Sequence, residues 1–249
     1  MSERIFQGRT AVVTGGSRGI GRAISLMLAG HGARVAVNYE RNEQAAQDAL
    51  RLMREVGGEG MAVRADIARP ADVERMLAQV RAQLGPIDFL VNNAGIADTV
   101  PHSELTFAHW KRTFEVNVDG VFLATWGVKD EMIARRFGRI VNISSLAGLI
   151  KKKDMIHYAT SKAAVIAFTR HCAEAFAPYN VRVNCLAPGL TETELSRAAN
   201  PGLLEQLIAI TPLGRMAQPE EMASAVKFLL SEESSFVTGQ TISACGGRL

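Results

Sequence analysis

The stretch Thr10-Ala-Val-Val-Thr-Gly-Gly-Ser-Arg-Gly-Ile-Gly21 joins a β-branched run to a glycine-rich turn. The run Thr10–Thr14 favours a strand, and Arg22–Ala29 behind the turn has the apolar spacing of a helix. Such strand–turn–helix units place backbone N–H groups at a helix N-terminus, where they bind pyrophosphate groups. The spacing is G-x3-G-x-G rather than the more common G-x-G-x-x-G. By itself the turn is therefore either a nucleotide cradle or only a tight connection.

Strand-like and helix-like segments alternate from this unit to the end of the 249-residue chain. This alternation predicts a mainly parallel, seven-stranded sheet with helices on both faces, a doubly wound α/β fold of the Rossmann type. No linker rich in proline, glycine or serine divides the chain, so we expect one domain over residues 1–249. The expected strands are Thr10–Thr14, Arg34–Asn38, Gly60–Ala65, Ile87–Asn92, Arg139–Ser144, Val181–Ala187 and Thr241–Ser243. The expected helices span residues 19–30, 42–57, 70–84, 107–136, 158–178 and 219–231.

Composition argues against several classes of protein. A net charge of +3, with no block of like charges longer than Lys151–Lys153, gives no nucleic-acid footprint. The cysteines, Cys172, Cys185 and Cys245, form no metal-binding pattern, so we expect no metal and free thiols in a reducing cytoplasm. The N-terminus has no hydrophobic signal core and no segment is long enough to span a bilayer. We therefore expect a cytoplasmic protein with no membrane partner.

Tyr158 and Lys162 are four residues apart at the start of a helical segment, and Ser145 lies thirteen residues upstream. Residues four apart share a helix face, so the Lys162 ammonium is expected beside the Tyr158 phenol. A positive charge there favours the phenolate and would lower the phenol pKa from about 10 toward neutrality. Tyrosine would then serve as an acid and a base near neutral pH. The pair alone is a weak signal, because such spacing also arises by chance.

These residues belong to a longer series of motifs. In chain order the series is Thr14-Gly15, Gly19-Ile-Gly21, Asn92-Asn-Ala-Gly95, Asn117, Ser145, Tyr158-x3-Lys162 and Pro188-Gly189. With these motifs the chain, from about residue 6 to residue 247, resembles the short-chain dehydrogenase/reductase family. Within that family it is most similar to the 3-oxoacyl-acyl-carrier-protein reductase group. The residues that carry this closer likeness are Ile143–Gly148, Pro188–Thr193, Thr238-Gly-Gln and Gly246-Gly247.

The resemblance implies an oxidoreductase that transfers a hydride between a nicotinamide cofactor and a carbonyl or secondary alcohol. Tyr158 would be the general acid/base, and Lys162 would lower its pKa and hold the nicotinamide ribose. Ser145 would bind the substrate oxygen; it is favoured over Ser144 by its thirteen-residue spacing to Tyr158. Asn117 would complete a catalytic tetrad through a water-linked proton relay, with a plain core hydrogen bond as the alternative.

The same resemblance assigns cofactor contacts along one sheet edge, because ligands of doubly wound sheets bind beyond the carboxyl ends of the strands. The glycine turn would hold the phosphates, Asn92–Gly95 would pass the adenosine half, and Thr193 would approach the carboxamide. Asp66 would bind adenine or instead cap the helix that starts at Pro70. Segment 189–211 is expected to close over the substrate. The expected cofactor-binding residues are Gly15, Ser17, Arg18, Gly19, Ile20, Gly21, Asn38, Arg41, Asp66, Asn92, Ala94, Gly95, Tyr158, Lys162, Pro188, Gly189 and Thr193.

The second strand favours NADP(H) over NAD(H). A carboxylate at the end of this strand would bind the ribose 2′-hydroxyl of NAD and repel the 2′-phosphate of NADP. Here that position is predicted to be the neutral Asn38, and both Arg18 and Arg41 would reach a 2′-phosphate. In the alternative, both arginines are solvated and Glu40 turns inward to hold a 2′-hydroxyl, as in an NAD(H)-linked secondary-alcohol dehydrogenase.

Two other functions fit parts of the sequence. The stretch Gly15–Gly19 matches the G-x-S-x-G elbow of α/β-hydrolases, but it follows the first strand and no histidine occurs after His171. A nucleotide-binding redox sensor without turnover would need neither Tyr158 nor Lys162, and both are present. His157 could tune proton transfer at Tyr158, but neighbours on a helix face different ways, which favours a contact without function.

The expected substrate is a 3-oxoacyl thioester or a related ketone. Basic residues beside the pocket mouth often receive an acyl-carrier protein in the resembled group. Arg135 and Arg136 match that feature, whereas residues 175–180 lack the second basic residue, so a carrier-protein partner and a free small-molecule substrate both stay open.

The helix expected over residues 107–136 is apolar on more than one face, with Trp110, Phe114, Val118, Phe122 and Trp126. A helix that is apolar well beyond one stripe must be buried on both sides. This pattern predicts a homo-oligomer, and the family resemblance implies a homotetramer.

Overall fold

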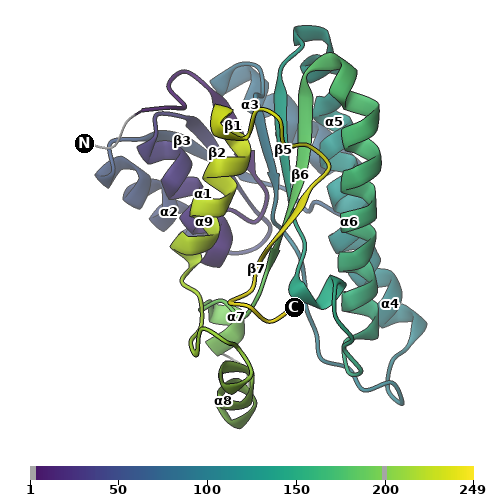
Figure 1. Ribbon diagram of the computed structural model, residues 1–249. Coiled ribbons are helices and arrows are strands. Elements are labelled where there is room, and N and C mark those ends of the chain that lie inside the picture. The colour runs from purple at the N-terminus through teal and green to yellow at the C-terminus, as the bar shows by residue number, and fades with distance from the viewer. Residues whose placement is uncertain (1–3, 198–200) are drawn as a thin grey trace.

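One parallel sheet of seven strands forms the centre of the computed structural model, which describes residues 4–197 and 201–249 (Figure 1). The strand order is β3-β2-β1-β4-β5-β6-β7, so it reverses between β1 and β4. The strands are β1 (Thr10–Val13), β2 (Arg34–Tyr39), β3 (Glu59–Arg64), β4 (Phe89–Asn92), β5 (Gly138–Ile143), β6 (Val181–Pro188) and β7 (Thr241–Ala244). The doubly wound α/β fold predicted from the sequence is confirmed.

Helices cover both faces of this sheet (Figure 1). One layer contains α1, α2 and α9, and the other contains α3, α5 and α6. The helices are α1 (Gly19–Gly30), α2 (Glu43–Glu55), α3 (Pro70–Leu84), α4 (Phe107–Phe114), α5 (Gly120–Arg135), α6 (Ile156–Phe176), α7 (Glu194–Arg197), α8 (Pro201–Ala209) and α9 (Pro219–Leu230).

The core lies on both sides of the sheet because successive strand side chains point to opposite faces. In β1, Ala11 and Val13 pack in the layer of α1 and α9, whereas Val12 packs in the layer of α3 and α5. All three are fully buried. Strands buried on both faces are continuous apolar runs in the sequence, which is why the parallel sheet was recognisable there.

The helix predicted over residues 107–136 is interrupted in the middle. α4 ends at Phe114, residues Glu115–Asp119 form a π-helical turn, and α5 begins at Gly120. The other predicted boundaries agree with the structure within two residues. Segment 189–211, which is expected to close over the substrate and for which no helix was predicted, contains α7 and α8. Such π-helical turns are common at functional sites, and this one carries Asn117.

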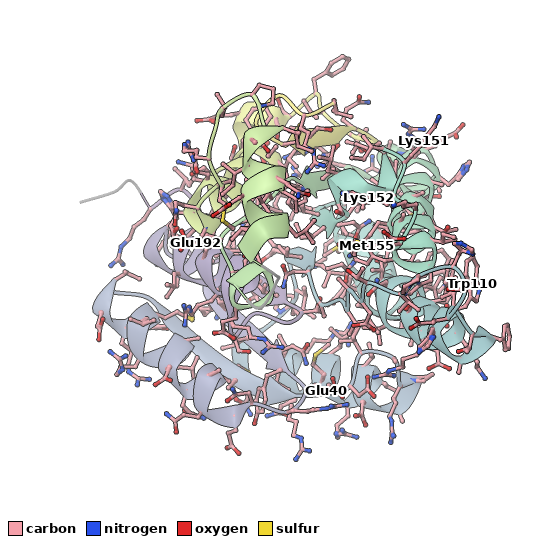
Figure 2. The ribbon with its side chains drawn as sticks, turned by 90° about the horizontal axis from the view of Figure 1, so that it is seen from below. Glu40, Trp110, Lys151, Lys152, Met155 and Glu192 are labelled. Carbon is pink, nitrogen blue, oxygen red and sulfur yellow. The ribbon has the colours of Figure 1, made fainter. Side chains whose placement is uncertain are left out.

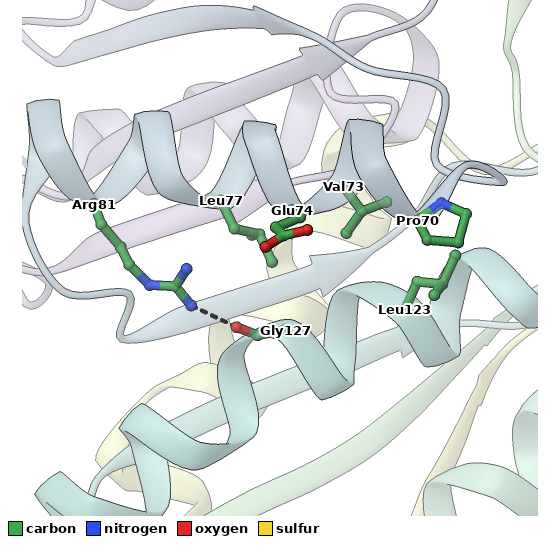
Figure 3. A pocket seen from close by; sticks show the side chains of 7 residues that line it. All are labelled: Pro70, Val73, Glu74, Leu77, Arg81, Leu123 and Gly127. Atoms are coloured by element: carbon green, nitrogen blue, oxygen red, sulfur yellow. Dashed lines mark hydrogen bonds between the residues drawn. The ribbon is translucent and has the colours of Figure 1, made fainter.

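The helices α3 and α5 pack closely beside a small groove of about 130 Å³ (Figure 3). A Cβ at Gly127 would lie 2.3 Å from the Leu77 methyl carbon Cδ1, so a larger residue here would require the Leu77 side chain to move. Arg81 on α3 donates a hydrogen bond to the Gly127 carbonyl oxygen on α5. The groove is thus a feature of helix packing.

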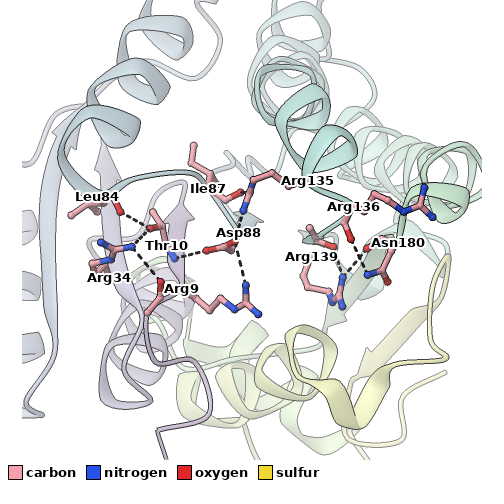
Figure 4. A network of polar contacts seen from close by, with 12 residues as sticks. Arg9, Thr10, Arg34, Leu84, Ile87, Asp88, Arg135, Arg136, Arg139 and Asn180 are labelled. Carbon is pink, nitrogen blue, oxygen red and sulfur yellow. Dashed lines mark hydrogen bonds and ion pairs between the residues drawn. The ribbon is translucent and has the colours of Figure 1, made fainter.

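A charged network lies at the amino edge of the sheet (Figure 4). The Asp88 carboxylate, just before β4, accepts hydrogen bonds from Thr10 N at 3.0 Å and from Arg135 Nη1 at 2.7 Å. Arg136, in the left-handed conformation at the end of α5, donates to the Pro178 carbonyl oxygen at 3.0 Å. The expectation that Arg135 and Arg136 border the substrate mouth of their own chain is therefore wrong, because α5 ends at the opposite edge of the sheet.

All three cysteines are buried and unpaired, as expected from their spacing. Within residues 4–197 and 201–249, none of the helices combines the length and apolarity needed to cross a membrane.

Candidate active site

The glycine-rich turn lies at the carboxyl edge of the sheet, which faces the viewer in Figure 2. Gly15 and Gly19 have φ angles of 60° and 52°, a region that strains residues with a side chain. A Cβ on Gly21 would lie 2.3 Å from the Gly15 carbonyl oxygen, so α1 begins against the turn itself. The first N–H groups of a helix have no partners within it. Here they adjoin a backbone free of side chains, which is the arrangement of a phosphate cradle.

Hydrogen bonds join β1 to β4 directly beneath this turn. Thr14 Oγ1 accepts from the backbone N–H groups of Asn93 at 2.9 Å and Ala94 at 3.0 Å. In return, Asn93 Nδ2 donates to the carbonyl oxygens of Thr14 at 3.0 Å and Gly15 at 3.1 Å. Asn93 lies within the predicted segment Asn92–Gly95, but it was not singled out among the expected cofactor-binding residues. The sequence feature that could have identified Asn93 is its position directly after β4, one of the two strands between which the strand order reverses.

Asn38 supports the same turn from β2 but is not the last residue of that strand. Its Oδ1 accepts from Gly15 N at 3.1 Å and its Nδ2 donates to the Ala65 carbonyl oxygen at 3.1 Å. The side chain is only 2% exposed. Because β2 continues through Tyr39, the expected strand-end position at Asn38 is wrong, and Glu40 and Arg41 follow the strand.

Asn92 and Asp66, two residues predicted to contact the cofactor, form hydrogen bonds within the protein instead. Asn92 is buried, and its Nδ2 donates to Asn142 Oδ1 at 2.8 Å, so its side chain is committed to the core rather than to a cofactor. Asp66 Oδ1 accepts from Ala68 N at 3.0 Å, in the turn that precedes α3. The alternative that Asp66 caps α3 is wrong, because the cap position is Arg69.

The segment after β6 reaches across to the glycine turn. A Cβ on Gly19 would lie 3.3 Å from Thr193 Cγ2, so Thr193 covers the turn. Arg18 and Glu194 form an exposed ion pair at 3.5 Å. Pro188 ends β6, and Gly189 allows the chain to pass Cys245. These contacts bring the predicted residues of β1 and β6 together.

Two residues of the turn point inward. Ser17 is 5% exposed, and Ile20 packs against the core, so any contact they make with a ligand is through the backbone. A buried serine is unlike the exposed nucleophile of a hydrolase elbow.

Ser145, Tyr158 and Lys162 meet between β5 and α6. The Ser145 hydroxyl lies close enough to the Tyr158 phenol to oppose the rise of the phenol pKa, and it accepts a hydrogen bond from Ala147 N at 3.1 Å. Lys162 Nζ lies 5.9 Å from the centre of the Tyr158 ring and donates to the Ile143 carbonyl oxygen at 3.0 Å. The Ser145 hydroxyl and the Tyr158 phenol thus lie next to each other, with the buried Lys162 ammonium nearby.

Ser144, the neighbour of Ser145, serves the core instead. Its hydroxyl donates to the Lys162 carbonyl oxygen at 2.7 Å, and the residue is 4% exposed. This bond ties α6 to the end of β5, and it supports the choice of Ser145 for the site.

Asn117 positions the backbone beside Lys162. Its Nδ2 donates to the Ile96 carbonyl oxygen at 2.9 Å and to Ser161 Oγ at 3.0 Å, while its Oδ1 accepts from Ile96 N at 2.9 Å. Both amide hydrogens are therefore used in the core. A Cβ on Gly95 would lie 3.1 Å from Asn117 Oδ1 and 3.2 Å from Lys162 Nζ, so the chain passes directly against the ammonium.

Burial dominates the electrostatics of this cluster. It lowers the pKa of Lys162 to about 8, against a smaller opposing effect of Cys185. It also raises the pKa of Tyr158, against the smaller opposing effect of the hydrogen bond with Ser145. The sequence predicted a lowered Tyr158 pKa, and that prediction is wrong for this state. Burial disfavours the phenolate, and Lys162 Nζ is held at Ile143.

His157, next to Tyr158, is fully buried, and neither ring nitrogen has a hydrogen-bond partner. Burial lowers its pKa, Asp98 opposes this, and His109 reinforces it. The imidazole is therefore neutral at pH 7, packed at the start of α6.

The site fits a nicotinamide dinucleotide. A Cβ at Gly15 would lie 3.0 Å from Ala94 Cα, and one at Gly21 would lie 2.3 Å from the Gly15 carbonyl oxygen, so only glycines let this turn pack so closely; Thr193 lies over it. Ser145, Tyr158 and Lys162 lie along the same sheet edge. Lys162 is buried, Ser145 and Tyr158 are half-buried, and Gly95 passes against the Lys162 ammonium. A phosphate cradle beside a proton-donating cluster defines a dinucleotide-dependent oxidoreductase.

The comparisons with known proteins agree with this class. The family model described as short chain dehydrogenase matches residues 9–203. The 3-oxoacyl-acyl-carrier-protein reductase of Synechocystis sp. is 37% identical over 240 residues, 96% of each chain. That of Escherichia coli is 36% identical over 244 residues, 97% of this chain and 98% of the relative. The structure of such a reductase from Brucella melitensis has a TM-score of 0.92 at 33% identity, covering 99% of this chain and 94% of that one. The chain belongs to the short-chain dehydrogenase/reductase family, as the sequence predicted.

The lowered pKa of Lys162 predicts a pH limit on cofactor use. The ammonium is charged below pH 8 and neutral above it, so kcat/KM for the reduced cofactor should fall as the pH rises past about 8. Lys162→Arg keeps the positive charge at high pH, so its kcat/KM should not fall above pH 8. Identical profiles for the two proteins would contradict the assignment.

The buried imidazole of His157 predicts a stability effect in acid. In the unfolded chain His157 binds a proton near its usual pKa of 6.5, whereas burial lowers its pKa in the folded chain. The free energy of unfolding therefore falls as the pH drops below 6.5. His157→Asn should show a smaller loss of Tm than wild type between pH 7.5 and 5.5, at one protein concentration. His102→Asn, at an exposed position, is the control and should follow wild type. Parallel curves for all three proteins would refute this origin of the acid sensitivity.

Proposed function

We propose that the protein is an NADP(H)-dependent reductase of 3-oxoacyl thioesters or closely related ketones. The observation that carries the proposal is the meeting of Ser145, Tyr158 and Lys162 with the glycine turn at one sheet edge. The likeness to two 3-oxoacyl-acyl-carrier-protein reductases supports a thioester substrate. The alternative is an NAD(H)-linked secondary-alcohol dehydrogenase. A comparison of kcat/KM with NADPH and NADH, described below, distinguishes the two.

The glycine turn Gly15–Gly21 would hold the phosphates of a nicotinamide cofactor, which when bound would supply a hydride to the carbonyl carbon. Ser145 donates a hydrogen bond to the carbonyl oxygen, where negative charge develops. Tyr158 gives its hydroxyl proton to that oxygen, and the Lys162 ammonium stabilises the phenolate that remains. Because burial raises the pKa of Tyr158, the phenol is protonated at neutral pH and can act as the acid in carbonyl reduction. Asn117 acts as a positioning residue through Ile96 and Ser161.

Tyr158→Phe removes the proton donor and little volume. We expect kcat to fall by about 100- to 10,000-fold while the dissociation constant of the cofactor changes little. Tyr179→Phe, at an exposed tyrosine, is the matched control and should retain full activity. Retention of most of kcat by Tyr158→Phe would remove this residue from its assigned role.

Segment 189–211 is the proposed cover of the substrate. It reaches the glycine turn through Thr193, and its Glu194 pairs with Arg18. A carrier protein that docked on Arg135 and Arg136 would stand at the opposite sheet edge of the same chain. Those residues would therefore reach a substrate mouth only on a neighbouring subunit.

Two exposed arginines support NADP(H). Arg18 adjoins the glycine turn and Arg41 follows β2. Among the described residues, each is paired only with one surface carboxylate, Glu194 for Arg18 and Glu40 for Arg41. Such exposed pairs contribute little, so a 2′-phosphate would replace them at small cost. Glu40 is the group that would favour NAD(H), and its pairing with Arg41 at 3.1 Å counters that effect.

Cofactor preference tests this assignment. Wild type should show a higher kcat/KM with NADPH than with NADH, and Arg18→Ala and Arg41→Ala should each reduce the ratio by about tenfold. Glu40→Gln should raise the ratio, and Arg51→Ala, at an exposed arginine on α2, is the control. Equal or better use of NADH by wild type would overturn the assignment.

We also propose a homotetramer that buries aromatic side chains of α4 and α5. Phe122 and Trp126 on α5 stack with their centroids 4.4 Å apart, yet their side chains remain exposed. On α4, Trp110 stacks on the neighbouring Phe114 at 4.6 Å. Large exposed apolar patches mark interaction surfaces, and here they follow the helix that the sequence showed to be apolar on more than one face.

Light scattering on the purified protein tests the assembly. We expect a particle of four times the 26.9 kDa chain at micromolar concentration. Trp126→Glu should lower this mass, whereas Phe236→Glu, at a fully exposed site in another loop, should not. A particle of one chain mass for wild type would contradict the proposal.

A further inference from the structure

The proposed substrate cover brings an acidic residue to the glycine-rich turn. The chain leaves β6 after Pro188, and Glu194 begins the short helix α7 beyond the carboxyl end of the sheet (Figure 1). The Glu194 carboxylate pairs with the Arg18 guanidinium at 3.5 Å. The two residues are 176 positions apart in the chain, so this contact joins the cover to the proposed cofactor site.

Hydrogen bonds on both sides of Glu194 fix where its carboxylate lies. At the start of the cover, Glu192 N donates to the Ala217 carbonyl oxygen at 2.8 Å. Thr193 N donates to Ser196 Oγ at 2.8 Å, and Ser196 N donates back to Thr193 Oγ1 at 3.3 Å. Thr193 itself lies over the glycine turn. Glu194 is therefore held beside the turn by its neighbours and not by the ion pair alone.

Arg18 is also the cation that the proposed function assigns to the 2′-phosphate of NADP(H). Within the part of the chain that the structure describes, Glu194 is the only carboxylate that pairs with Arg18, because Glu40 after β2 pairs with Arg41. Two anions beside one guanidinium repel each other. The Glu194 carboxylate therefore opposes the 2′-phosphate, whether it stays beside Arg18 or must move away from it.

We infer that Glu194 is a specificity-determining residue, which competes with the 2′-phosphate of the cofactor for Arg18. This inference rests on the proposed NADP(H) function and adds a determinant on the cover, outside both β2 and the glycine turn. NADP(H) and NAD(H) share the pyrophosphate, which backbone N–H groups of the turn would hold. Glu194 therefore weakens the binding of NADP(H) selectively, and it limits the preference that Arg18 and Arg41 create.

Fluorescence titrations with NADPH and NADH measure this competition. Glu194→Gln should lower the dissociation constant of NADPH about two- to fivefold, as expected for an exposed ion pair, and leave that of NADH unchanged. Calorimetric titration with 2′,5′-ADP, which carries the phosphate without the nicotinamide, should show the same gain. Glu194→Asp keeps the charge and should remain close to wild type. Glu192→Gln is the matched control, because Glu192 lies two residues earlier and accepts from Gln218 Nε2 at 2.8 Å.

A double-mutant cycle separates competition for Arg18 from a general loss of negative charge. In the Arg18→Ala background, Glu194→Gln should no longer change the affinity for NADPH. Unchanged NADPH affinity in Glu194→Gln, an equal gain for NADH, or a gain that persists without Arg18 would each overturn this role of Glu194. Failure of the proposed NADP(H) function would appear differently, as a wild type that binds NADH at least as tightly as NADPH.

Discussion

The site depends on the hydrogen bonds between Thr14 and Asn93 at the reversal of strand order. They join segments about eighty residues apart and fix the glycine turn over the gap between β1 and β4. Asn38 adds a third support from β2 through Gly15 N. Because these side chains satisfy the turn from beneath, its upper face carries only backbone, and α1 points its N-terminus at that face. The proposed cofactor cradle is therefore a consequence of how the two halves of the sheet are joined.

The proposed catalytic cluster depends in turn on where α6 is held. Ser144 binds the Lys162 carbonyl oxygen, and Asn142 Nδ2 donates to Thr169 Oγ1 at 2.9 Å, so β5 fixes α6 at two points. This places the Lys162 ammonium against Ile143 in a poorly hydrated position, where its pKa falls to about 8. The same burial keeps the Tyr158 phenol protonated. One packing arrangement thus prepares an acid and the cation that stabilises its conjugate base.

The strand–turn–helix unit, the alternation of elements and the Tyr158–Lys162 spacing were readable in the sequence, because local periodicity and chain order determine them. The errors lie where the result depends on three-dimensional partners. Asn38 was taken for a strand end, but its neighbours across β3 extend the strand to Tyr39. Arg135 and Arg136 were placed at the mouth, although their ion pair and backbone contacts lie at the far end of α5. The direction of the Tyr158 pKa shift required knowledge of burial, which spacing does not supply.

Titration of the protein with NADPH, followed by cofactor fluorescence, tests most directly whether the bonded turn is the cofactor site. The account predicts saturable binding by wild type with a dissociation constant on the order of micromolar, the lower part of the usual KM range. It predicts binding at least tenfold weaker in Asn93→Ala, a variant that removes two side-chain hydrogen bonds to the turn, with the circular dichroism spectrum unchanged. Equal affinity in the two proteins, or no binding by wild type at millimolar cofactor, would contradict it.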